Sequence, residues 1–83
     1  MISKILQQYD DIDFLKLDNF DSAIIGVSEN FNESHKLIYS VSKIIEILEK
    51  DMTREQSIEY FTFNVSGSYV GEKTPIFCWD NFE

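Results

Sequence analysis

The chain has 83 residues, of which 43% are hydrophobic and 14% aromatic, and it contains only three Gly and one Pro. This composition excludes a disordered linker, and the length predicts a single domain spanning residues 1–83. Fifteen Asp and Glu residues against seven Lys and Arg give a formal net charge of −8, which argues against binding to nucleic acid or to anionic lipid, because both require a basic surface.

One helix and two strands are predicted in the N-terminal half. Apolar residues at positions 2, 5, 6 and 9 follow the helical period and indicate a short amphipathic helix. We expect the acidic residues 10–21 to form a connecting segment whose apolar side chains hold it against the core. The β-branched run at 23–27 predicts a strand, and residues 36–39 predict a second strand that forms a hairpin with the first.

Two helices and a third strand are predicted in the C-terminal half. Residues 42–50 follow the helical period, with Ser40 or Ser42 as the cap. The sequence at 53–56 matches a capping box, which predicts a further helix over 54–66. Residues 75–79 then predict the third strand.

The capping box is formed by Thr53 and Gln56, and Gly67 suits the end of the helix that follows it. Ile58, Phe61 and Val65 are expected to form the inner stripe of that helix.

The predicted element order is α-β-β-α-α-β, in which strands and helices do not alternate one for one. We therefore expect an α+β fold, with a small antiparallel three-stranded sheet and helices packed mainly on one face. The side chains expected in the core are Ile25, Ile44, Leu48, Phe61 and Phe77.

Catalytic and metal-binding patterns do not emerge from the sequence. Cys78 lies between Phe77 and Trp79, a setting typical of a buried small hydrophobe rather than a reactive thiolate. His35 is expected to be a surface residue of a polar loop. The Asp residues between positions 10 and 21 fail the EF-hand pattern, because no Gly follows at the middle of the loop. We therefore expect no catalytic residue, no metal and no cofactor.

The acidic segment and the aromatic residues are better suited to binding another protein. Asp10, Asp11 and Asp13 could steer a basic partner, because complementary charge accelerates encounter. An aromatic cluster either completes the core or forms an interface, where Tyr is enriched. Its members are Tyr60, Phe61, Phe63 and Tyr69. The sequence leaves both interpretations open.

Residues 59–77 read EYFTFNVSGSYVGEKTPIF. They resemble a family of small uncharacterised proteins from bacteriophages and prophages with the pattern E-Y-F-x-F-N-x-x-G-x-Y-V-G-E-x-T-P-x-F. The resemblance extends over about residues 18–79, and residues 20–27 look like the family's first strand and its lead-in. Within the motif, Tyr69 and Glu72 lie between predicted elements and are the candidates for partner contact.

Small acidic phage proteins are often inhibitors of bacterial defence, and by analogy the resemblance implies an anti-CRISPR or other anti-defence role. The predicted partner is a host protein with a basic surface, such as a CRISPR effector nuclease, and carboxylates that mimic nucleic-acid phosphates are one mechanism. The alternative is a small accessory or regulatory protein, for instance a homodimer, and a metal-dependent enzyme is the least favoured. In each case we expect a cytoplasmic location. The predicted partner-binding residues are Asp10, Asp11, Asp13, Tyr60, Tyr69 and Glu72.

Overall fold

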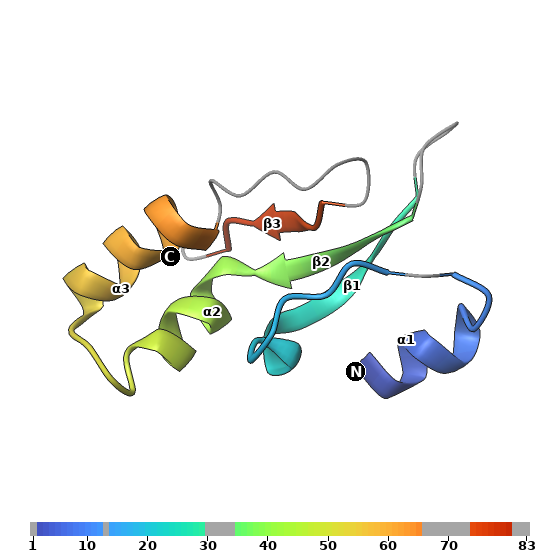
Figure 1. Cartoon of the computed structure of the whole chain (residues 1–83), viewed down its shortest axis with the longest axis horizontal. Helices are drawn as coiled ribbons and strands as arrows, with labels where there is room; N and C mark the ends of the chain where they lie inside the picture. Colours follow the sequence, from blue (N-terminus) through green and yellow to red (C-terminus); the bar gives the residue numbers. More distant parts are fainter. Residues whose placement is uncertain (1, 13, 30–34, 66–73, 81–83) are drawn as a thin grey trace.

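The computed structural model describes residues 2–12, 14–29, 35–65 and 74–80. In chain order, the elements are α1 (Ile2–Gln8), the 3₁₀ turn η1 (Asp21–Ala23), β1 (Ile24–Ser28), β2 (Lys36–Ser40), α2 (Val41–Leu48), α3 (Arg54–Tyr60), the π-helical turn η2 (Phe61–Val65) and β3 (Ile76–Cys78). This arrangement confirms the α+β class. Figure 1 shows α2 and α3 at one end of the long axis and α1 toward the other end. None of the helices in these ranges has the length and apolarity needed to cross a bilayer.

The sheet is mixed rather than antiparallel. Its strand order is β1-β2-β3, with β1 antiparallel to β2 and β3 parallel to β2. The prediction of an antiparallel sheet is therefore wrong for its third strand. The reason lies in the connection, because α2, α3 and η2 all lie between β2 and β3. A helical crossover of this kind carries the chain back to the starting end of the sheet, so that the next strand runs in the same direction.

A bulge in β1 changes which of its side chains face the core. The pairing passes from Ile24 opposite Tyr39 to Gly26 opposite Ile38, so Ile25 is the extra residue. An extra residue reverses the alternation of side chains from that point along the strand. Ile24 is only 2% exposed, whereas Ile25 is half-buried. The prediction that Ile25 belongs to the core is therefore wrong.

One continuous apolar core joins the sheet to the helices. Leu37 and Tyr39, two residues apart on β2, are fully buried, as expected for side chains on the same face of a strand. Predicted burial is confirmed for Ile44 and Phe61, while Leu48 and Phe77 are half-buried against the same cluster. The buried apolar residues are Ile5, Ala23, Ile24, Leu37, Tyr39, Val41, Ile44, Ile45, Phe61 and Val65.

The acidic connecting segment is held against this core by a buried tyrosine. The backbone N–H of Leu17 donates a hydrogen bond of 2.9 Å to the Tyr39 hydroxyl, and Phe14, Leu17 and Phe20 pack against the core cluster. Burial raises the pKa of Tyr39 above its ordinary value, despite the opposing effect of the Leu17 hydrogen bond. The expectation that apolar side chains hold this segment in place is confirmed.

Both predicted caps are present. The Ser40 hydroxyl accepts a hydrogen bond from Lys43 N and thereby caps α2. At the start of α3, Gln56 N donates to Thr53 Oγ1 and Thr53 N donates to Gln56 Oε1, each at 3.1 Å. These two bonds complete the capping box and satisfy two backbone donors that a helix start leaves unpaired. The helix then continues as η2 to Val65, close to the predicted end at 66; Gly67 lies outside the described residues.

Candidate protein-binding face

The segment α3–η2 turns one side to the core and the other to solvent. Its buried residues are Ser57 and Phe61, each 0% exposed, and Val65, which is 7% exposed. The Ser57 hydroxyl is satisfied within the helix, because it donates to Thr53 O at 2.8 Å. The inward stripe therefore follows positions 57, 61 and 65. The predicted stripe is wrong at Ile58, which is 38% exposed.

The π-helical turn η2 explains how this four-residue spacing stays aligned with the core. In an α-helix a step of four residues overshoots a full turn by about 40°, so a stripe at i, i+4 and i+8 drifts around the axis. In η2 the hydrogen bonds close over five residues instead of four, so the turn is wider and offsets the drift. Phe61 and Val65 consequently both remain buried. The residues between them, including Phe63, are directed to solvent.

Phe61 anchors this segment to β3. Its ring meets Phe77 edge-on, with centroids 5.3 Å apart, and Trp79 at 5.5 Å. Edge-to-face pairs of this kind add to the stabilisation that burial of the ring provides. The outer side of α3–η2 is therefore presented on a firmly packed helix.

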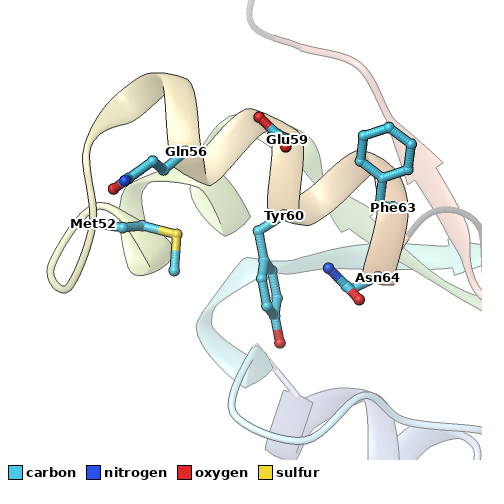
Figure 2. A pocket seen from close by; sticks show the side chains of 6 residues that line it. All are labelled: Met52, Gln56, Glu59, Tyr60, Phe63 and Asn64. Atoms are coloured by element: carbon cyan, nitrogen blue, oxygen red, sulfur yellow. The ribbon is translucent and has the colours of Figure 1, made fainter.

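The solvent side of this helix forms an open groove of about 630 Å³. We call it the α3 groove and define it by Met52, Gln56, Glu59, Tyr60, Phe63 and Asn64. Figure 2 shows that these side chains, apart from Met52, come from one stretch of helix, and that Met52 extends from the preceding turn toward Tyr60. Glu59 and Phe63 point to one side of the helix, and Tyr60 points to the other.

Two large aromatic side chains in the α3 groove are exposed. Phe63 is 74% exposed and Tyr60 is 44% exposed, although Phe61 between them is fully buried. The structure thus divides the aromatic cluster that the sequence left open, placing Phe61 in the core and Tyr60 and Phe63 on the surface. Exposed Tyr and Phe side chains are enriched at protein interfaces.

The α3 groove also carries a negative charge. Among the described residues that line it, Glu59 is the charged one, and it forms no ion pair within the described ranges. Arg54 does not neutralise it, because its guanidinium lies 3.2 Å from a Glu49 carboxylate oxygen. Glu55, also exposed on α3, adds a second carboxylate to this end of the molecule.

The predicted partner-binding residues do not form one site. Asp10 and Asp11 are exposed in the turn that follows α1, and Figure 1 shows this turn and α3 toward opposite ends of a molecule 39 Å long. Tyr60 belongs to the α3 groove. Asp13, Tyr69 and Glu72 lie outside the described residues, so their predicted roles stay predictions.

A cluster of polar groups caps the N-terminus of α2. The Asp80 carboxylate accepts hydrogen bonds from the Ser40 hydroxyl at 2.5 Å and from Ser42 N at 3.0 Å. These bonds, led by the one from Ser40, lower the pKa of Asp80 below its ordinary value. Since the Ser40 hydroxyl also accepts from Lys43 N, this arrangement serves as a helix cap that ties the chain after β3 to α2.

The described residues contain no group of three or more His, Cys, Asp or Glu placed to hold a metal ion. His35 contacts the Tyr9 ring, with centroids 5.4 Å apart, and lies 3.4 Å from a Glu29 carboxylate oxygen. Cys78 is half-buried in β3.

The sequence selected Tyr60 and left Phe63 open between core and interface, but it did not identify Met52 or Glu59 as members of the same surface. The sequence feature that indicates this surface is the four-residue spacing of positions 57, 61 and 65, which identifies the inner side of the helix and hence the outer one. The serine at 57 obscures this spacing, because an apolar stripe in the sequence passes through Ile58 instead.

No protein-family model, no curated protein and no solved structure matches this chain. These comparisons therefore add nothing to the functional argument.

Proposed function

We propose that the protein is a binding module that docks on a basic surface of a protein partner. The observation that carries this proposal is the exposed Tyr60 and Phe63 pair on a helix whose opposite side is anchored in the core. A rigid helix loses little conformational freedom on docking, so more of the contact energy contributes to affinity. Aromatic side chains in such positions are frequent binding hot spots.

The charge of the chain supports a basic partner. A net charge of −8 on 83 residues accelerates encounter with a positive surface and repels other acidic proteins. Nucleic-acid-binding sites of proteins are basic. The resemblance of residues 59–77 to phage proteins makes inhibition of a bacterial defence protein, such as a CRISPR effector nuclease, the concrete form of the proposal. In this form the protein occupies the surface that would otherwise bind nucleic acid.

The experiment is a plaque assay on bacteria that carry a defined defence system. Cells express the wild-type protein, the double variant Tyr60→Ala/Phe63→Ala, or Glu46→Gln as a control for an exposed charge on α2. The proposal predicts that wild type and Glu46→Gln restore plaque formation against at least one system and that the double variant does not. Purified wild-type protein should also block DNA cleavage by the corresponding nuclease. Unchanged plaque formation across a panel of nuclease-based systems would contradict the inhibitor role.

A further inference from the structure

We propose that the α3 groove binds an arginine-bearing segment of the partner, with the guanidinium against Glu59 and the ring of Phe63, and with neighbouring apolar atoms of the segment against Tyr60. This inference rests on the proposed function and specifies the chemistry of the contact. Three features of the groove lead to it: exposed aromatic rings, a carboxylate that forms no ion pair with any residue the structure describes, and the negative charge of the surrounding helix.

The aromatic rings favour a cation. A ring face carries negative electrostatic potential and attracts a cationic group within about 6 Å of its centre, with arginine used more often than lysine. Phe63 and Tyr60 are exposed enough to be approached by a partner side chain. Met52 adds a polarizable, adaptable wall next to Tyr60, which suits the methylene stem of a long side chain.

Glu59 provides the charge partner. Within the described ranges it has no ion pair, while the nearby cation Arg54 is already bound to Glu49. A guanidinium matches a carboxylate in two parallel hydrogen bonds, and its planar group can stack on a ring at the same time. Lysine offers a compact charge without this planar geometry. Arginine therefore fits the combination of Glu59 with Phe63 better than lysine does.

The same charge argues against a second copy of this chain as the occupant. A partner with a net charge of −8 would bring further carboxylates toward Glu55 and Glu59. Like charges facing each other disfavour association. The volume of about 630 Å³ suits a few side chains of an inserted segment.

The test is an NMR titration of the ¹⁵N-labelled full chain with an end-blocked pentapeptide, Ala-Leu-Arg-Leu-Ala. The matched probe carries citrulline in place of arginine, which keeps the shape and removes the charge. We expect amide shifts concentrated at residues 52–65 with the arginine probe. A cation–aromatic contact at an exposed site corresponds to about a two- to fivefold change in affinity. The citrulline probe and the variants Glu59→Gln and Phe63→Ala should each weaken binding by at least this factor.

Glu46→Gln removes an exposed carboxylate of α2 that does not line the α3 groove, and it should bind the arginine probe like wild type. Equal binding of the arginine and citrulline probes, or shifts centred on Asp10 and Asp11, would overturn the inference. So would an unaltered affinity in Glu59→Gln. These outcomes are independent of the plaque assay: restored plaques with no arginine preference in the groove would leave the proposed function standing and the arginine site wrong.

Discussion

Replacing Phe61 by alanine tests the anchoring of α3–η2 most severely. The ring is fully buried and contacts both Phe77 and Trp79 edge-on. Truncation of a buried Phe costs about 3–5 kcal/mol in unfolding free energy, part of which is the loss of aromatic pairs worth about 0.5–1.5 kcal/mol each. A domain of this length is expected to have a stability of roughly 4–12 kcal/mol. Phe61→Ala should therefore be close to unfolded. Phe61→Leu keeps most of the side-chain volume, so its unfolding free energy should fall by less.

The assay is urea denaturation followed by the fluorescence of Trp79, the single tryptophan of the chain. With a denaturant slope of about 1 kcal/mol per M, a loss of 3 kcal/mol moves the midpoint down by about 3 M. Phe63→Ala is the matched control, because this ring lies on the same helix and is 74% exposed. It should change the unfolding free energy by less than about 0.5 kcal/mol. Equal losses in Phe61→Ala and Phe63→Ala would refute the assignment of inner and outer sides.

Two further changes test the contact between Leu17 and Tyr39 and the contact between Asp80 and the start of α2. Tyr39→Phe should lower the unfolding free energy by about 1 kcal/mol, because it leaves Leu17 N–H without its acceptor; Tyr60→Phe, on the exposed ring, should lower it far less, and equal losses in urea denaturation would contradict the role of the buried hydroxyl. Asp80→Asn tests the cap of α2. Because the folded-state pKa of Asp80 is lowered from 3.8, its contribution is present above that pH and is lost as the pH falls through the lower folded value. The stability difference between wild type and Asp80→Asn should therefore be constant well above pH 3.8 and shrink as the pH falls below it. The effect should be small because the carboxylate is exposed, and a constant difference would argue against a charge effect.

Local signals in the sequence identified the elements well, since they depend on neighbouring residues. The capping box at Thr53 and Gln56 and the cap at Ser40 are confirmed by their hydrogen bonds. The direction of β3 was not predictable in this way, because strand pairing depends on where the chain re-enters the sheet after α2 and α3. The bulge at Ile25 likewise depends on pairing with β2 rather than on the sequence of β1.

The candidate site was predicted only in part for the same reason. Tyr60 could be proposed from its residue type, but its grouping with Phe63 and Glu59 requires knowing that Ser57 faces the core. A serine enters the inner stripe because its hydroxyl bonds to Thr53 O and needs no partner elsewhere. The π-helical turn then sets which aromatic residues remain outside. Neither effect follows from counting apolar residues.

Docking of the α3 groove on a basic surface is tested by binding kinetics with the defence protein that the plaque assay identifies. Association rates are measured across a salt series for wild type and for Phe63→Ala. If a negatively charged α3 groove docks on a basic surface, association should slow steeply as the Debye length falls from about 10 Å at 0.1 M to about 3 Å at 1 M. Phe63→Ala should mainly raise the dissociation rate, because an anchoring ring acts after encounter. Rates that are independent of salt and unaltered in Phe63→Ala would contradict both the electrostatic mechanism and the assignment of the binding face.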